Sequence, residues 1–240
     1  MAVEVLEQLY EGKAKRVYKT SDPDLYMIEY KDDATAFNGV KHGTIEGKGV
    51  INNKMSAMLF KELEKSGIET HLVEFIDDNH MLVKRVEIVK LEVIVRNITA
   101  GSLAKRMGTE EGIVLPRPVM EFSYKSDELG DPMINRYHAT AFGIAKDEEV
   151  DEIIAYALKI NTLLQDIFDK ANLTLVDFKL EFGRKPDGTI ILADEISPDT
   201  CRLWDKDTNE KMDKDRFRRD LGGVEEAYQE VYRRLTALNL

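Results

Sequence analysis

Two lysines near the start of the chain have the type and spacing to bind phosphates. Lys13 and Lys15 follow Gly12, and residues two apart point to the same face of an extended strand. Ammonium groups bind phosphate oxygens as point charges, and glycine lets the backbone approach a ligand closely. The segment therefore predicts contact with the phosphates of a nucleotide. The alternative is a turn glycine followed by two solvated lysines on an edge strand.

A second group of ionisable side chains lies on an expected hairpin. Over residues 177–182 ionisable and apolar residues alternate, which places Asp177, Lys179 and Glu181 on one face of a strand. A two-residue turn at 187–188 would put Glu181 directly opposite Asp194. Like charges so placed repel each other unless a cation lies between them. Two carboxylates that bind Mg²⁺ together with substrate phosphates meet that requirement.

The length of the turn leaves other arrangements open. A four-residue turn keeps both carboxylates on one face in a diagonal relation, whereas a three-residue turn brings Glu195 to that face instead. A solvated sheet face with ordinary charges is the remaining alternative. The metal site is therefore a hypothesis that depends on the register.

A third group suits an anion. Residues 91–95 predict a central strand that ends at Arg96, and a helix is expected to start near Thr99, a suitable N-cap. A helix start offers free N–H groups, to which Arg96 and Ser102 add charge and a hydroxyl. Arg202, after the hairpin, adds a further anion anchor. The alternative is a capping turn with a surface arginine.

Other chemistries lack support in the sequence. The four histidines do not have metal-ligand spacing, and no base is spaced to activate Cys201, the single cysteine. Neither a Walker-type glycine-rich loop nor a Rossmann fingerprint is present. A covalent enzyme intermediate, a zinc site and a dinucleotide fold are therefore not expected.

The elements that must position these groups predict the α+β class. The first ~85 residues are β-rich, with strand pairs around turns at 21–24 and 77–79. A helix over residues 51–67 lies between the pairs. Residues 147–171 form the clearest helix, with an acidic start and an apolar stripe. Residues 112–142 hold three of the six prolines and little periodicity, so they predict a functional loop or one that packs on a partner.

Composition restricts the partners. Thirty-four basic and 45 acidic residues give a net charge of −11, which argues against a nucleic acid as partner. No apolar stretch approaches the ~18 residues of a membrane span. A single cysteine agrees with a reducing compartment. A soluble, cytoplasmic protein with no membrane partner is expected.

Taken in order, these segments resemble the SAICAR synthetases along nearly the whole chain. The matching stretches are residues 10–15, 95–97, 100–102, 176–183, 194–195, 197–199, 202–205 and 213–217. The resemblance implies an ATP-dependent ligase. Such an enzyme joins L-aspartate to 5-amino-1-(5-phospho-D-ribosyl)imidazole-4-carboxylate, here the carboxylated ribotide, and gives SAICAR, ADP and phosphate in purine biosynthesis.

The resemblance also implies how the chain is organised. It implies an α+β fold with an antiparallel-sheet N-terminal part over residues 1–86, which binds the nucleotide. A larger α+β part over residues 87–240 would bind substrate and metal, with an ATP-grasp-like cleft between the two. The resemblance further implies ATP as co-substrate, Mg²⁺ as cofactor and a homodimer as the assembly.

Individual residues acquire roles from the same resemblance. The nucleotide would be contacted by Gly12, Lys13, Lys15, Lys84 and Glu92. Catalysis is assigned to Lys179, Glu181 and Asp194, of which the two carboxylates would hold Mg²⁺. The carboxylated ribotide would be bound by Arg96, Ser102, Lys125, Asp131 and Arg202. The implied reaction is phosphorylation of the imidazole carboxylate followed by attack of the aspartate amine, which needs no protein nucleophile.

Two positions depart from the family pattern. Asn38 stands where family members often have an aspartate, which places a ligand role there in doubt. Lys90 stands where an apolar residue and proline are common. Two other functions stay open: a kinase or a ligase for another amine in the same ATP cleft, and a nucleotide-binding regulatory module without turnover.

Overall fold

The first of two main sheets comes from the N-terminal third of the chain. The computed structural model describes residues 3–36 and 40–240. The sheet is antiparallel, five-stranded and ordered β1-β2-β3-β7-β6. Its strands are β1 (Val5–Glu11), β2 (Lys15–Thr20), β3 (Leu25–Tyr30), β6 (Leu72–Phe75) and β7 (His80–Lys84). A separate small hairpin pairs β4 (Asp33–Ala36) with β5 (Lys41–Thr44).

The second sheet has seven strands. Its main path is ordered β11-β10-β9-β12-β13, and β12 also pairs with β8 and β14. The strands are β8 (Glu87–Ile88), β9 (Leu91–Ile98), β10 (Val114–Tyr124), β11 (Met133–Ile134), β12 (Leu173–Arg184), β13 (Ile190–Ala193) and β14 (Cys201–Asp205). β12 is central, because it pairs with four other strands.

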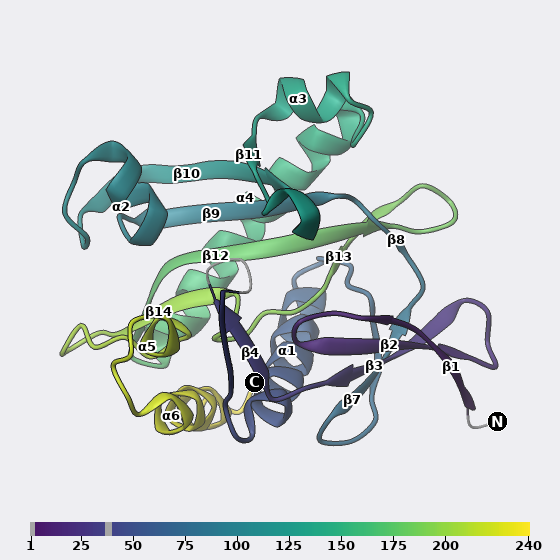
Figure 1. Cartoon of the computed structure of the whole chain (residues 1–240), viewed down its shortest axis with the longest axis horizontal. Coiled ribbons are helices and arrows are strands. Elements are labelled where there is room, and N and C mark those ends of the chain that lie inside the picture. The colour runs from purple at the N-terminus through teal and green to yellow at the C-terminus, as the bar shows by residue number, and fades with distance from the viewer. Residues whose placement is uncertain (1–2, 37–39) are drawn as a thin grey trace.

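Two long helices cover these sheets (Figure 1). α1 (Lys48–Lys65) packs against β3, β6 and β7 of the first sheet and against α6 (Val224–Thr236). α4 (Asp147–Lys170) packs against β9, β12 and β13. Each buries an apolar stripe of helical spacing, so the predicted helices are confirmed. The shorter helices are α2 (Gly101–Met107), η1 (Asp127–Leu129), α3 (Arg136–Ala141) and α5 (Asp215–Arg218).

The two sheets share one hydrophobic core. A parallel bridge joins Thr70 to Leu192. The buried Ser56 hydroxyl on α1 donates to the Ile196 carbonyl and accepts from the Ile196 N–H. Both contacts tie the first sheet and its helix to the segment that follows β13. The α+β class is confirmed, and no helix in the described ranges is long and apolar enough to cross a membrane.

Residues 112–142 are not the loop that their prolines predict. They contain β10, η1, β11 and α3. Pro116 and Pro118 fall between Val114 and Val119, where the register between β10 and β9 shifts. Proline lacks an N–H and is tolerated where the ladder is interrupted. The prediction of a long loop was therefore wrong, because the prolines mark an irregularity within a strand.

Two local predictions around Arg96 were also wrong. β9 continues to Ile98, so Arg96 lies inside the strand and does not end it. Ala100, and not Thr99, is the N-cap of α2. The Thr99 hydroxyl instead donates to the Glu110 carbonyl and accepts from the Ile113 N–H. Thr99 therefore fixes the loop after α2.

The hairpin of β12 and β13 has the three-residue turn. The Lys185 N–H donates to the Thr189 carbonyl, and Glu181 pairs with Ala193. The two-residue turn was therefore wrong. β13 ends at Ala193, and Asp194 has φ +61°. This left-handed conformation is more accessible to aspartate than to most residues. It turns the chain out of the ladder directly after Ala193.

Candidate active site

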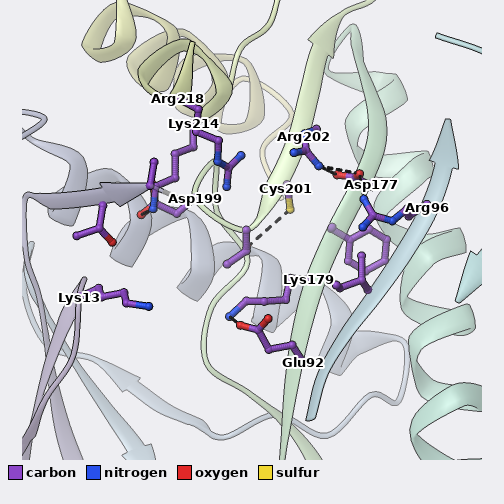
Figure 2. A pocket seen from close by; sticks show the side chains of 15 residues that line it. Lys13, Glu92, Arg96, Asp177, Lys179, Asp199, Cys201, Arg202, Lys214 and Arg218 are labelled. Atoms are coloured by element: carbon purple, nitrogen blue, oxygen red, sulfur yellow. Dashed lines mark hydrogen bonds and ion pairs between the residues drawn. The ribbon is translucent and has the colours of Figure 1, made fainter. Parts of the chain in front are cut away.

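Two adjoining cavities, of about 630 and 310 Å³, bring most of the predicted residues together. The larger is lined by the β1–β2 turn, by β12 and by the segment after β13. The smaller is lined by β9, β12, β14 and α5 (Figure 2). Six of the described residues line both cavities: Lys13, Glu92, Lys179, Asp199, Thr200 and Lys214. We call this shared boundary the junction.

Lys179 is the centre of the charged cluster in the larger cavity. Its Nζ lies 2.5 Å from a Glu181 carboxylate oxygen, 3.3 Å from Glu92 and 3.5 Å from Asp194. The β-strand alternation on β12 puts Lys179 and Glu181 on the same face, as the sequence predicts. Burial alone would lower the pKa of Lys179, but Glu181, Asp194 and Glu92 outweigh it and raise the pKa well above its usual value.

Lys15 connects the first sheet to the same cluster. Its Nζ pairs with Asp194 and lies 3.0 Å from Glu195. Burial opposes its charge, yet the two carboxylates raise the pKa of Lys15 above its usual range. The pKa of Asp194 is correspondingly low, because Lys15 and Lys179 outweigh the effect of burial. Lys15 and Asp194 therefore form a charged pair at neutral pH.

The carboxylates of Glu181 and Asp194 suit a magnesium ion chemically. Both line the larger cavity, and the Lys179 ammonium contacts both at once, so one cation can lie between them. No cluster of three or more His, Cys, Asp or Glu ligands occurs in residues 3–36 and 40–240. Mg²⁺ that is completed by substrate phosphates and water does not need such a cluster. The donor set therefore fits the ion.

Two arginines dominate the smaller cavity. Arg96 donates to Glu121 (2.6 Å), to Asp177 (2.8 Å) and to Ser102 (3.2 Å). Arg202 donates to the same Asp177 at 2.9 Å and to Asp215 at 3.0 Å. Figure 2 shows both guanidinium groups meeting at Asp177. Fixed in this way, the two guanidinium groups have little conformational freedom left to lose.

The remaining predicted residues occupy several places. Gly12, Lys13, Glu92, Lys125 and Asp131 line the larger cavity, and Lys125 pairs with Glu181 at 3.0 Å. Ser102 touches the site through Arg96. Lys84 lines neither cavity; it donates to the Thr70 carbonyl and pairs with Glu69.

One of the two positions that depart from the family pattern contributes to the site. Lys90 lines the larger cavity, and its carbonyl accepts from the Lys125 N–H. Asn38 lies outside the described residues.

Sequence reasoning missed a second charged cluster. Lys48, buried at the start of α1, pairs with Asp199, which also accepts from Tyr228 and lies near Lys214. Arg218 lines the smaller cavity beside them. Lys48 precedes the apolar stripe of α1, and Tyr228 belongs to the stripe of α6, so periodicity placed both residues near the core and not near chemistry. The sequence feature that could have revealed this cluster is a lysine one helical turn before a buried apolar stripe.

Comparison with known proteins identifies the family. A family model described as SAICAR synthetase matches residues 8–235. A phosphoribosylaminoimidazole-succinocarboxamide synthase from Coprothermobacter proteolyticus is 61% identical over 233 residues, which make up 97% of this chain and 99% of that protein.

Solved structures agree. The synthase from Ehrlichia chaffeensis matches with a TM-score of 0.94 at 44% identity, covering 96% of this chain and 99% of that one. A SAICAR synthetase in complex with ADP matches with a TM-score of 0.93 at 50% identity, over 96% and 98% of the two chains. Sequence, fold and the matched length together lead to one conclusion: the chain belongs to the SAICAR synthetase family.

Proposed function

We propose that the larger cavity holds ATP with Mg²⁺ and the smaller cavity holds the carboxylated ribotide, so that they react at the junction. As a SAICAR synthetase, the protein is an ATP-dependent ligase of purine biosynthesis. It joins L-aspartate to 5-amino-1-(5-phospho-D-ribosyl)imidazole-4-carboxylate and gives SAICAR, ADP and phosphate. The observation behind this assignment is that six residues line both cavities, so reactants bound in the two cavities would meet there.

The larger cavity suits a nucleotide. Lys13 reaches it from the β1–β2 turn, Lys15 from the start of β2 and Lys179 from the middle of β12, which surrounds the phosphates with ammonium groups. The relative with a TM-score of 0.93 was solved with ADP, and we infer the same ligand here. We further propose that residues 1–86 form the nucleotide-binding part and residues 87–240 the part that binds substrate and metal.

The smaller cavity suits a phosphate ester. Arg96 and Arg202 are fixed by Asp177, Glu121 and Asp215, and planar guanidinium groups match a phosphate with paired hydrogen bonds. Ser102 adds a hydroxyl next to Arg96. We assign the ribotide phosphate to this end, which leaves the imidazole carboxylate free to point to the junction.

Glu181 and Asp194 would hold Mg²⁺ in the larger cavity. When bound, the ion supplies charge neutralisation for the transferring phosphoryl group. Lys179, Lys15 and Lys125 hold these carboxylates in place. The lysines also stabilise negative charge as the phosphoryl group leaves ADP and forms the acyl phosphate, so catalysis rests on positioning and electrostatics.

No protein nucleophile is required for the second step. The aspartate amine attacks the acyl carbon, the C–N bond forms, the bond to the phosphate oxygen breaks, and the proton that the amine loses leaves with the phosphate. Cys201 lines the smaller cavity, but burial raises the pKa of its thiol far above the usual range. A thiol so protonated is a poor nucleophile, which agrees with direct attack by the amine.

The test is a coupled assay with ATP, Mg²⁺, L-aspartate and the carboxylated ribotide. We expect ADP release only when both acceptor substrates are present. ADP release without aspartate would favour a kinase, and release with another amine would favour a different ligase. Nucleotide binding without any turnover would favour a regulatory module.

Two further properties stay proposals. We propose a cytoplasmic location on the basis of the single cysteine. We also propose a homodimer, which exposed apolar side chains between residues 129 and 142 support. They are Leu129, Met133, Tyr137 and Phe142. Several exposed apolar side chains within one segment are typical of a protein interface.

A further inference from the structure

Lys214 lies where the two reactants must meet. It directly precedes α5 and lines both cavities, and Figure 2 shows its side chain reaching to Asp199. If the proposed function is correct, the γ-phosphoryl group comes from the larger cavity and the imidazole carboxylate from the smaller. A side chain that contacts both at the moment of transfer has to belong to the junction.

Three described cations line the junction, and they differ in how well they are neutralised. Lys13 pairs with Asp127 at 2.6 Å. Lys179 has three carboxylates within 3.5 Å. Within residues 3–36 and 40–240, Lys214 pairs only with Asp199, at 3.4 Å. Of the three, Lys214 is therefore the cation with the most capacity for a new anion.

Asp199 is itself already neutralised. Lys48 Nζ lies 2.9 Å from Asp199 Oδ2, and the side chain of Lys48 has 0% exposure. The Tyr228 hydroxyl donates to Oδ1 at 2.6 Å. A fully buried lysine is rare unless it is paired, and Asp199 is the only carboxylate paired with Lys48 in the described ranges. Lys48 therefore cancels the charge that would otherwise hold Lys214 away from a substrate.

We propose that Lys214 is a further catalytic residue that binds the carboxylate undergoing phosphorylation, and that Lys48 is a positioning residue acting through Asp199. The step it assists forms a bond between a carboxylate oxygen and the γ-phosphorus and breaks the bond from that phosphorus to ADP. Lys214 transfers no proton. It stabilises negative charge on the oxygens that pass from the reactants into the acyl phosphate.

The electrostatic surroundings of Lys214 support this role. Burial lowers its pKa; Asp199 and Glu195 oppose the shift, while Lys48 and Arg218 add to it. The net effect is a lowered pKa, so an arriving anion stabilises the charged form. Because the anion binds the protonated lysine, kcat/KM for the ribotide should fall as pH rises through the pKa of Lys214 in the free enzyme.

The first experiment compares Lys214→Met and Lys214→Arg with Lys185→Met, a control in which the lysine pairs with Glu69 and lines neither cavity. We expect Lys214→Met to lower kcat/KM for the ribotide by about 100-fold or more while the Kd of ADP stays near that of the wild type. Lys214→Arg should keep part of the activity and move the alkaline limb of the pH profile upward. Wild-type kcat/KM in Lys214→Met, or an unmoved limb in Lys214→Arg, would overturn the catalytic role.

The second experiment tests Lys48. In Lys48→Met, Asp199 is left to pair with Lys214, so turnover should fall. In Lys48→Met/Asp199→Asn both charges of the buried pair are gone. We expect kcat/KM of this double variant to be at least about 10-fold higher than that of Lys48→Met. A purely structural lysine predicts no such recovery, and a double variant no better than the single one would overturn the positioning role. Thermal unfolding and the Kd of ADP report whether each variant is folded.

The outcome for the wild type separates the two proposals. If the wild-type protein makes no SAICAR from the complete substrate mixture, the proposed function fails. If the wild type is active and the Lys214 variants match it, only the present inference fails.

Discussion

At the scale of single residues, ammonium groups separate the carboxylates that sequence reasoning expected to repel each other. Glu181 and Asp194 both contact Lys179, and Asp194 also contacts Lys15. A metal is therefore not needed to relieve repulsion in the free protein. Neutralising either carboxylate therefore removes an ion pair with a lysine and relieves no repulsion.

Glu181→Gln and Asp194→Asn should each lower kcat by about 100-fold or more, since groups that stabilise transferring charge contribute that much. Each should also lower the melting temperature in metal-free buffer, because a partly buried ammonium loses one of its carboxylate partners. Calorimetry and the coupled assay measure both effects. The matched control is Asp166→Asn, an exposed carboxylate paired with Lys170. Near-wild-type turnover in both site variants would refute the catalytic assignment.

Arg96→Lys and Arg202→Lys keep the charge but not the planar fork. We expect the KM of the ribotide to rise about 10- to 150-fold, the effect of losing one charge-assisted hydrogen bond. The KM of ATP should change much less, because other lysines face the larger cavity. Steady-state kinetics with each substrate varied in turn gives the comparison. A rise in the KM of ATP alone would place the phosphate ester elsewhere.

Asp213 makes stability depend on pH. Burial raises its pKa from 3.8 to about 7, helped by Asp215. Between these values the folded chain holds a proton that the unfolded chain has lost, so the free energy of unfolding falls as pH rises from about 4 to about 7. In urea unfolding, the free energy of unfolding should fall more between pH 5 and pH 8 for the wild type than for Asp213→Asn, whose side chain cannot ionise. Equal losses would show that Asp213 does not titrate in this range.

At the scale of elements, alternation and helical periodicity predicted most of the structure. The apolar stripes of α1 and α4 and the alternation on β12 gave the right elements, because burial on one face is a local property of sequence. The hairpin register could not be fixed, since turn length depends on three φ/ψ pairs that composition barely constrains. The cluster around Lys48 was missed for a different reason: its partners come from α6 and the segment after β13, which no local pattern joins.

The structure distinguishes Lys13, in the β1–β2 turn, from Lys15, at the start of β2, although the sequence predicts the same phosphate-binding role for both. Lys13 is half exposed and pairs with the exposed Asp127, whereas Lys15 is largely buried against Asp194 and Glu195. We expect Lys13→Ala to weaken ATP use with little change in melting temperature. Lys15→Ala should weaken ATP use and lower the melting temperature as well, because Asp194 and Glu195 each lose an ion pair with a largely buried lysine. Normal ATP binding in both variants would mean that neither lysine contacts the nucleotide.

At the scale of the whole molecule, residues 112–142 contribute two strands to the second sheet and are not the predicted loop. The segment nevertheless exposes apolar side chains that could pack on a second copy of the chain. Sedimentation should show a dimer whose dissociation depends on concentration. Tyr137→Ser and Phe142→Ser, at 76% and 79% exposure, should shift it to monomer. Leu221→Ser, another exposed apolar position, is the control. A wild-type mass that stays monomeric at all concentrations would refute the dimer.

The ion pair between Lys48 and Asp199 has a consequence for synthesis on the ribosome. Its two residues are 151 positions apart in the chain, so at 5–20 residues per second Asp199 is added roughly 8 to 30 s after Lys48. During that interval α1 also lacks α6, which covers part of it in the finished protein. The nascent N-terminal segment thus carries an exposed apolar helix and an unpaired lysine until the C-terminal quarter emerges. Chaperones that hold exposed apolar chain would encounter this protein mainly in that window.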